Sequence, residues 1–189
     1  RESRPLDWAE QAASHPRWLV DEMAAVAPDQ VADWAAADNR EPPLVIRLRD
    51  PADDAMVTEL GGARSELVPG AVVLSERPRG PVEELPGFAA GRWWVQDLGA
   101  QAVVAMLAVE PGHRVLDACA APGGKTLAAA VHAGPEGRVV AVDKSAGRLG
   151  LLRRAVQRVG LSGVEVLERD LLAAPWAGGT FDSVLLDAP

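Results

Sequence analysis

The sequence predicts an α/β fold, a parallel sheet with helices on its faces, preceded by a small α+β module. From residue 113 onward, apolar strand patterns alternate with helix patterns, as in β-α-β units with parallel strands. Between residues 41 and 98 the strand and helix patterns are shorter and are interrupted by a Pro- and Gly-rich loop. A helical segment over residues 1–40 comes first, and the predicted parallel-sheet domain spans residues 99–189.

Composition excludes several classes of protein. Of the 189 residues, 48% are hydrophobic and 24% are charged, as in ordinary globular proteins. No stretch approaches the roughly 20 apolar residues of a membrane span, and no signal-peptide pattern is present. The single cysteine, Cys119, excludes an internal disulfide framework and a Cys-rich zinc site. We therefore expect a cytoplasmic protein, without structural metal, that acts as a monomer.

Charge is distributed unevenly along the chain. The net charge is −8, and residues 1–108 hold 18 acidic and 10 basic residues, which accounts for all of it. Residues 109–189 hold nine of each. An acidic first half is unusual for a protein that binds nucleic acid.

The first two segments are built from short elements. Apolar spacing before Asn39 predicts two or three helices, with Trp18 and Trp34 in their core. A strand is predicted from Leu44 to Leu48, followed by a helix that Gly61 and Gly62 close. The segments "GAVVLS" and "RWWV" predict two more strands.

The last segment contains the clearest periodicity. Strands are predicted in "HRVLDAC", "GRVVAVD", "VEVLERD" and "FDSVLLDA". A helix over "GGKTLAAAVHAG" ends at Gly134, and a second begins after Ser145 and ends before Gly160. That second helix has one apolar face and an opposite face, predicted to be solvated, that carries its arginines. The apolar residues are Leu149, Leu152, Val156 and Val159, and the arginines are Arg148, Arg154 and Arg158.

The turn "LDACAAPGGKT" between the first of these strands and its helix poses two alternatives. A P-loop requires a glycine five residues before Gly124, and Cys119 stands there instead. The dinucleotide fingerprint G-x-G-x-x-G is also absent. The strand "SVLLDAP" could still imitate the Walker B partner of a P-loop, so nucleotide binding stays open as an alternative.

Acidic residues close all four predicted strands. Asp143 follows Gly124 by 19 residues, where a carboxylate can accept hydrogen bonds from both ribose hydroxyls. Four carboxylates at one sheet edge would repel a triphosphate, but they suit a ligand with a sulfonium, an amino group and a ribose. S-adenosylmethionine has all three. The four acids are Asp117, Asp143, Asp170 and Asp187.

The segments "DACAAPGGKT", "VVAVDKSAGRLGLLRRAVQRVGL" and "FDSVLLDAP" resemble the RNA cytosine-5 methyltransferases, most of all the bacterial 16S ribosomal RNA methyltransferase B family, also called Sun or Fmu. The resemblance continues upstream through "SHPRWLV" and "LPGFAAGRWWVQDLGAQAV", so it covers nearly the whole chain. It implies a Rossmann-like methyltransferase domain, of which this chain holds the first four strands, preceded by a small RRM-like domain.

The resemblance also implies the site and the reaction. Asp143 would hold the ribose of S-adenosyl-L-methionine, Asp170 would lie beside the adenine, and Asp187 would face the methionine end or the target base. The substrate would be an unpaired or flipped cytosine of 16S ribosomal RNA, methylated at C5. The cofactor loop would consist of Cys119, Ala120, Ala121, Pro122, Gly123, Gly124 and Lys125.

The family's nucleophile is not among these residues. In the family, Asp-Ala-Pro is followed by a cysteine, and a second cysteine follows the fifth strand. The thiolate of one adds to C6 of the cytosine and the other helps to release the product, and the sequence given ends at Pro189. Cys119 sits in the cofactor turn, where we interpret it as a small buried residue. We therefore expect a chain that ends at Pro189 to be inactive in methyl transfer, even where it binds cofactor. A non-catalytic RNA-binding or assembly module with this fold is a further alternative.

Overall fold

The computed structural model describes residues 14–173, 176 and 178–188, and the chain forms two compact units, residues 1–42 and 43–189. The first unit packs its described helices around Val20, Val31 and Ala35, which confirms that helices precede Asn39. Trp34 packs against this core, but Trp18 is 66% exposed, so its predicted core position is wrong. Trp18 and the buried Val20 are two residues apart, which places them on nearly opposite sides of a helix. The elements are α2 (Arg17–Val26), the 3-10 turn η1 (Pro28–Gln30) and α3 (Val31–Asp38).

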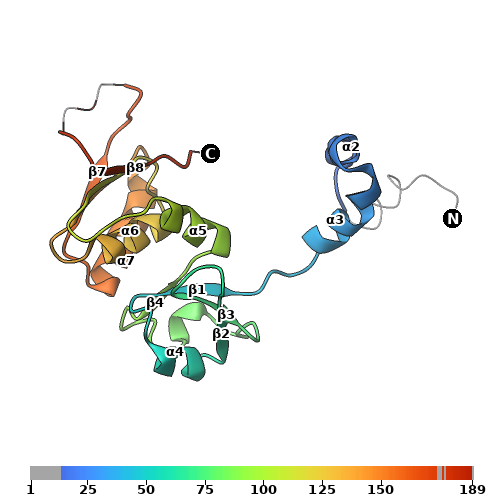
Figure 1. Ribbon diagram of the computed structural model, residues 1–189, viewed down its shortest axis with the longest axis horizontal. Helices are drawn as coiled ribbons and strands as arrows, with labels where there is room; N and C mark the ends of the chain where they lie inside the picture. The colour runs from blue at the N-terminus through green and yellow to red at the C-terminus, as the bar shows by residue number, and fades with distance from the viewer. Residues whose placement is uncertain (1–13, 174–175, 177, 189) are drawn as a thin grey trace, which may run out of the picture. The chain divides into compact units, whose positions relative to one another are not determined.

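The second unit begins with an antiparallel sheet of four strands in the order β2-β3-β1-β4 (Figure 1). Its core holds Ile46, Leu48, Met56 and Trp93, so one face of the sheet packs against the helix α4. The predicted strands and helix are confirmed, but Gly62 starts a strand that was not predicted, because three residues are too few to show a period. The elements are β1 (Val45–Leu48), α4 (Asp54–Glu59), β2 (Gly62–Arg64), β3 (Ala71–Leu74), η2 (Val82–Glu84) and β4 (Trp93–Val95).

A parallel sheet follows, with the strand order β7-β6-β5-β8. All four predicted strands and the helices between them are confirmed. Ser145 caps α7 by accepting a hydrogen bond from the Arg148 N–H (3.5 Å), and Gly160 ends it with φ at 74°, as predicted. The elements are α5 (Leu98–Met106), β5 (Arg114–Asp117), α6 (Gly124–Ala133), β6 (Arg138–Asp143), α7 (Ala146–Val159), β7 (Val164–Glu168) and β8 (Ser183–Leu185).

The two faces of the parallel sheet are covered differently. On one face, Val115 and Val139 pack against residues of α5, α6 and α7, among them Leu127. On the other face, Leu116 and Val140 pack against side chains from the segment between β7 and β8, and none of the described residues of this cluster is helical. The predicted helical cover is therefore found on one face of the sheet. The side chains on the other face include Leu171, Trp176 and Phe181.

One arginine of α7 departs from the predicted solvated face. Nη1 of Arg158 donates to the carbonyls of Phe88 (2.6 Å) and Trp93 (3.1 Å), and its guanidinium lies 3.8 Å from the centre of the Phe88 ring. The prediction fails for Arg158 because a long side chain can reach back from an outer helix face to backbone carbonyls. Arg148 and Arg154 are exposed, as predicted, although the guanidinium of Arg148 also donates to the carbonyl of Ala121.

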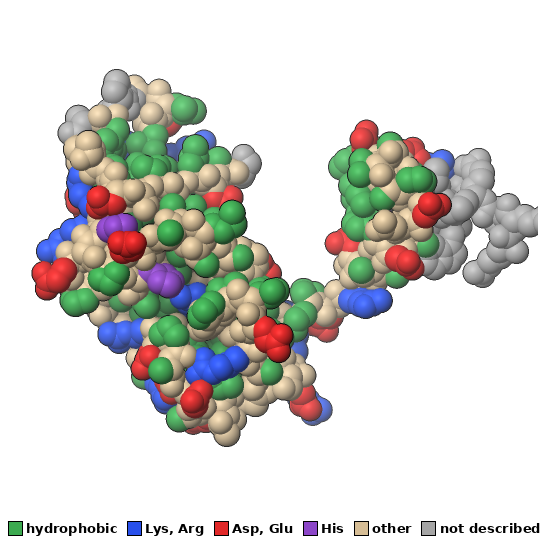
Figure 2. Space-filling view, in the orientation of Figure 1, with side chains coloured by type: hydrophobic (Ala, Val, Ile, Leu, Met, Phe, Trp, Pro, Cys, Tyr) green, Lys and Arg blue, Asp and Glu red, His purple; other side chains and the backbone are tan. Residues whose placement is uncertain are grey.

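The surface shows no gathering of one charge on the face that Figure 2 displays. Basic and acidic side chains are interspersed over the second unit there. Among the described residues, every helix is too short or too polar to cross a bilayer.

Candidate functional site

The turn after β5 is fixed by the sheet around it. The Ala118 N–H donates to the carbonyl of Leu185 (2.9 Å), and the Ala120 N–H donates to the carbonyl of Val142 (3.0 Å). The turn therefore continues the hydrogen bonding of the sheet on both sides of β5. It then passes through a cis peptide bond between Ala121 and Pro122 and reaches α6 at Gly124. The predicted cofactor loop, residues 119–125, is thus one continuous turn at the carboxyl edge of the sheet.

The two glycines of this turn differ in whether the fold requires them. Gly123 has φ at 118°, and a Cβ built there would lie 2.4 Å from Cδ1 of Leu152 on α7. Both the backbone conformation and the close approach of α7 therefore demand glycine. Gly124 has neither constraint, because its nearest neighbours are side-chain atoms of Gln96 at 3.5–3.8 Å from such a Cβ. The fold explains Gly123, but it leaves Gly124 unexplained.

Asp117 and Asp143 form the inner pair of carboxylates at this edge. Asp117 is 1% exposed and accepts a hydrogen bond from the Thr126 hydroxyl (2.7 Å), and burial raises its pKa. Asp143 is 8% exposed and accepts the N–H of Ala121 at one oxygen (3.1 Å) and the N–H of Ser145 at the other (2.9 Å). It therefore holds the turn against the start of α7.

Asp170 and Asp187 form an outer pair. Asp170 is exposed, and its side chain accepts the N–H of Leu172 (2.9 Å). Asp187 is half exposed and lies 2.5 Å from Nζ of Lys125, at the first turn of α6. The parallel topology thus brings all four predicted acids to one edge of the sheet, with the inner pair built into the fold and the outer pair open to solvent.

Cys119 is half-buried, so the interpretation of a fully buried small residue is too strong. Burial raises the pKa of its thiol, and the nearby carboxylates of Asp143, Asp117 and Asp187 raise it further. Thiolates are the reactive form of cysteine, and a neighbourhood of acids disfavours them. Its environment is the opposite of what a nucleophilic cysteine requires.

Sequence reasoning missed three contributors to this site. Thr126 holds Asp117, Arg148 binds the carbonyl of Ala121, and Gln96 lies over Gly124. Thr126 could have been found as the last residue of the quoted motif, nine residues after the aspartate it holds. Gln96 and Arg148 gave no local signal, because each reaches the turn from another element. The described residues contain no cluster of three or more His, Cys, Asp or Glu side chains able to hold a metal ion.

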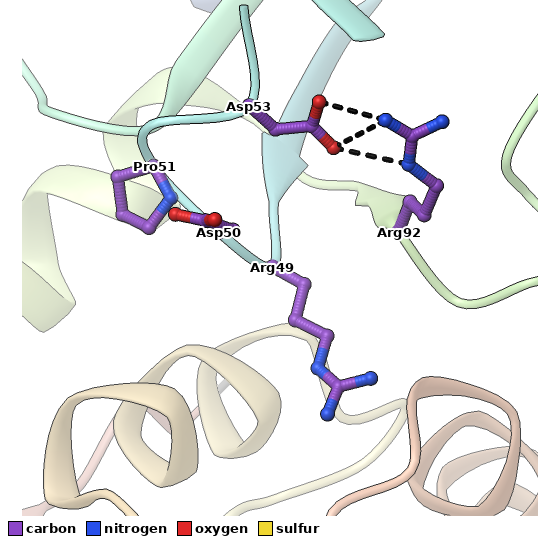
Figure 3. A pocket seen from close by; sticks show the side chains of 5 residues that line it. All are labelled: Arg49, Asp50, Pro51, Asp53 and Arg92. Atoms are coloured by element: carbon purple, nitrogen blue, oxygen red, sulfur yellow. Dashed lines mark hydrogen bonds and ion pairs between the residues drawn. The ribbon is translucent and has the colours of Figure 1, made fainter. Parts of the chain in front are cut away.

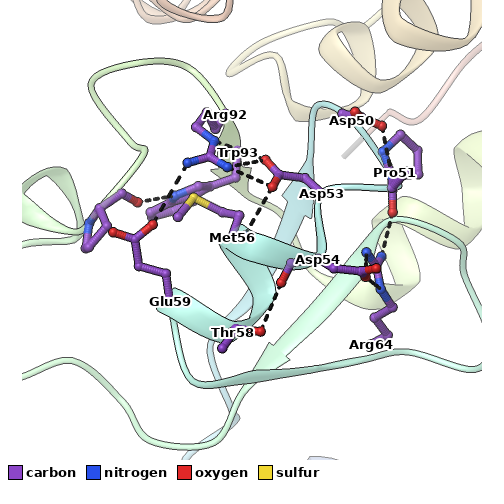
Figure 4. A network of polar contacts seen from close by, with 12 residues as sticks. Asp50, Pro51, Asp53, Asp54, Met56, Thr58, Glu59, Arg64, Arg92 and Trp93 are labelled. Atoms are coloured by element: carbon purple, nitrogen blue, oxygen red, sulfur yellow. Dashed lines mark hydrogen bonds and ion pairs between the residues drawn. The ribbon is translucent and has the colours of Figure 1, made fainter.

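A second polar cluster lies on the antiparallel module. The guanidinium of Arg92 donates to both oxygens of Asp53 (2.7–3.0 Å), and Asp53 also caps α4 through the Met56 N–H (Figure 4). Beside this pair is a cavity of about 420 Å³, which Arg49 also lines, with its guanidinium pointing away from Asp53 and Arg92 (Figure 3). The lining carries two arginines and two aspartates, so it selects for neither an anion nor a cation.

Known proteins are similar to this chain in sequence and in fold. Residues 104–189 match the family described as 16S rRNA methyltransferase RsmB/F. Ribosomal RNA small subunit methyltransferase B of Erwinia tasmaniensis is 38% identical over 188 residues, which are 95% of this chain and 43% of that protein. The chain thus spans less than half the length of this relative.

Solved structures are similar to this chain in fold. The crystal structure of PH0851 superposes with a TM-score of 0.89 over 100% of this chain and 44% of that one, at 28% identity. A methyltransferase homolog from Pyrococcus horikoshii superposes with a TM-score of 0.85 over 99% of this chain and 63% of that one; at 23% identity it shows the fold alone.

The parallel sheet, its Gly-rich turn and the acids at its edge define a domain of the Rossmann-like methyltransferase class. Within that class, residues 104–189 match the family described as 16S rRNA methyltransferase RsmB/F. The resemblance seen in the sequence is confirmed.

Proposed function

We propose that this chain is the cofactor-binding part of an S-adenosylmethionine-dependent methyltransferase that acts on C5 of a cytosine in 16S ribosomal RNA. The observation that carries the proposal is the family match over the segment that contains the turn and all four acids. The name of the Erwinia relative, a small-subunit rRNA methyltransferase, supports rRNA as the substrate. An enzyme of this kind would work in the cytoplasm, and we expect a monomer.

The residues at the sheet edge fit S-adenosylmethionine. Gly124 places no side chain at the start of α6, and the first turn of that helix presents backbone N–H groups that have no partner within the helix, which favour a carboxylate. The surrounding acids favour a cation, which the sulfonium and the amino group supply. When bound, the cofactor provides an activated methyl group.

We assign the roles of the acids as follows. Asp143 binds the ribose hydroxyls, because its two oxygens each accept one backbone N–H and keep a further lone pair. Asp170, exposed at the end of β7, lies beside the adenine. Asp187 faces the methionine end or the target base, where Lys125 holds its carboxylate in place. Residues 119–125 form the loop around the cofactor.

We propose that Cys119 is not the nucleophile that adds to C6 of the cytosine, because burial and the nearby carboxylates of Asp143, Asp117 and Asp187 raise the pKa of its thiol. The resemblance instead places the family's two cysteines, one of which is the nucleophile, beyond Pro189. We propose that residues 1–189 bind cofactor but do not transfer a methyl group without that nucleophilic cysteine.

We further propose that residues 41–98 form an RRM-like RNA-recognition domain. The support is the element order β1-α4-β2-β3-η2-β4, a β-α-β-β-α-β pattern in which a 3-10 turn replaces the second helix. RRM domains stack bases on an open sheet face. Here all four residues of β1 are buried, so RNA would contact the loops and edges of this domain and not its central strand.

Methyl transfer by the product of the whole gene tests the proposal. Incubation with 16S rRNA and methyl-labelled S-adenosylmethionine should label the RNA, and bisulfite sequencing should place the methyl group on C5 of one cytosine. Label on another base or none at all would contradict the proposal. The comparisons support neither alternative, a P-loop protein or a non-catalytic module.

A further inference from the structure

Gln96 stands out among the buried polar residues because one of its polar atoms is left over. It follows β4 in the antiparallel module and is 5% exposed. Its backbone N–H donates to Val45 (3.2 Å) and its carbonyl accepts from Gln101 (2.9 Å), so the backbone is fixed. Its side-chain Nε2 has no hydrogen-bond partner among the described residues.

The orientation of this amide follows from chemistry. Nε1 of Trp94 lies 3.0 Å from Oε1 of Gln96. An indole N–H can only donate, so the atom that faces it must be the amide oxygen. The NH₂ group of Gln96 is therefore turned away from Trp94, and Trp94 holds it there.

The amide lies over the start of α6. The three atoms nearest to the position of a Cβ on Gly124 all belong to Gln96, at 3.5, 3.6 and 3.8 Å, and the third is Nε2. A ligand atom bound against the backbone of Gly124 would thus come within reach of the amide NH₂. This also gives Gly124, which the fold leaves unexplained, a reason to lack a side chain.

The groups that Gln96 and the backbone at the first turn of α6 present here are hydrogen-bond donors. The N-cap of α6 is Gly123, which offers no side-chain acceptor, and the first turn of the helix contains no acidic residue. Its N–H groups and the helix dipole attract an anion with several acceptor oxygens. Of the groups on the proposed cofactor, the carboxylate of its amino-acid end is the one that matches.

We propose that Gln96 is a cofactor-binding residue whose amide NH₂ donates to the carboxylate of the bound cofactor at the first turn of α6. This inference rests on the proposed function. It means that the antiparallel module contributes to the cofactor site, and that it recognises the amino-acid end and not the nucleoside. A buried donor without a partner destabilises the free protein, and a ligand acceptor would supply the missing hydrogen bond.

Two ligands separate this role from a structural one. S-adenosylhomocysteine carries the carboxylate, whereas 5′-methylthioadenosine has the same nucleoside and no amino-acid end.

Gln96→Glu keeps the acceptor for Trp94 but replaces the donor, and Gln96→Met removes the donor without adding charge. Titration calorimetry on each variant should show binding of S-adenosylhomocysteine weakened at least 10-fold and binding of methylthioadenosine changed less than twofold. Gln157→Glu, an exposed glutamine of α7, is the matched control and should change neither.

Other outcomes overturn the inference. Equal weakening of both ligands would make Gln96 a structural residue, and no weakening of either would exclude it from the site. Unfolding of one variant, seen by circular dichroism, leaves the other to decide. If the unmodified protein bound neither ligand, the proposed function itself would fall, which is a different result from a change confined to the variants.

Discussion

The two sheets of the second unit both bury polar side chains, but they satisfy them differently. In the parallel sheet, Asp117 and Asp143 have their hydrogen bonds within the turn and helices they hold together. In the antiparallel sheet and the segment after it, Arg47, Gln96 and Gln101 are as deeply buried, yet each keeps one side-chain atom without a partner. Arg47 bonds to His132 on α6, and Gln101 of α5 bonds to the carbonyl of Ile46 in the antiparallel sheet.

Arg47 shows this most clearly. It is 1% exposed and donates to Nε2 of His132 on α6 at 2.9 Å, so His132 must be neutral there. Burial lowers the pKa of His132, and the charge of Arg47 lowers it further. The comparison shows that the buried acids at the carboxyl edge of the parallel sheet find their hydrogen-bond partners in the adjoining turn and helices. The antiparallel module depends instead on α5 and α6 for its polar contacts.

The largest expected effect comes from breaking the inner carboxylate pair. Asp143→Ala leaves the N–H groups of Ala121 and Ser145 without their acceptor, which should cost roughly 2–4 kcal/mol of unfolding free energy. Asp170→Ala, at the exposed end of β7, should change it by less than about 0.5 kcal/mol. Urea unfolding measures both. Equal effects would show that the two pairs do not differ.

Two arginines of the antiparallel module should lose different amounts of stability on the same substitution. Arg92→Met leaves the Asp53 carboxylate without its bidentate partner and should cost about 1–3 kcal/mol. Arg47→Met removes a buried cation that has no carboxylate, so the loss should stay below about 1 kcal/mol. The same urea experiment compares them. A larger loss in Arg47→Met would mean that the contact with His132 is a major stabilising one.

His132 should titrate at higher pH once Arg47 is replaced. In the unmodified protein its pKa is lowered on folding, so stability is lost as pH falls below the unfolded value of 6.5. Removal of the neighbouring charge in Arg47→Met should raise the pKa and flatten that dependence between pH 7 and 5. An NMR titration of His132 reads the pKa directly. An unchanged value would contradict the contact.

Asp117 should change stability with pH in the direction opposite to His132. Its folded pKa is raised above the unfolded value of 3.8, so it contributes stability at low pH that is lost as pH rises through the folded pKa. Asp117→Asn removes this pH-dependent contribution to the free energy of unfolding. The melting temperature of the variant, relative to the unmodified protein, should therefore be more favourable at pH 7.5 than at pH 4.5. A difference independent of pH would refute the burial of a charged Asp117.

The smallest expected effect is on the reactivity of the Cys119 thiol. Because the pKa of Cys119 is raised, alkylation by iodoacetamide in the folded protein should be slower at pH 8 than in urea-unfolded protein, and cofactor binding should survive Cys119→Ser. Faster alkylation in the folded protein would reopen Cys119 as a nucleophile.

Local patterns predicted much of this molecule. The strands of the parallel sheet, the cap at Ser145 and the acids at strand ends depend on neighbours in sequence, and the structure has them as expected. Arg47 and Arg158 could not be predicted in the same way, because their partners are distant in sequence and belong to another module. The same holds for the approach of Gln96 to Gly124, which lies on α6. Trp18 failed for a simpler reason, since a short surface helix buries only one of its sides.

Binding of S-adenosylhomocysteine is the most direct test of the claim that the carboxyl edge of the parallel sheet holds S-adenosylmethionine. Calorimetric titration against S-adenosylhomocysteine and against Mg-ATP, at the same protein concentration, decides it. We expect saturable binding of S-adenosylhomocysteine at one site and none of Mg-ATP. Binding of Mg-ATP without S-adenosylhomocysteine would contradict the account and restore the phosphate-binding interpretation of the Gly-rich turn.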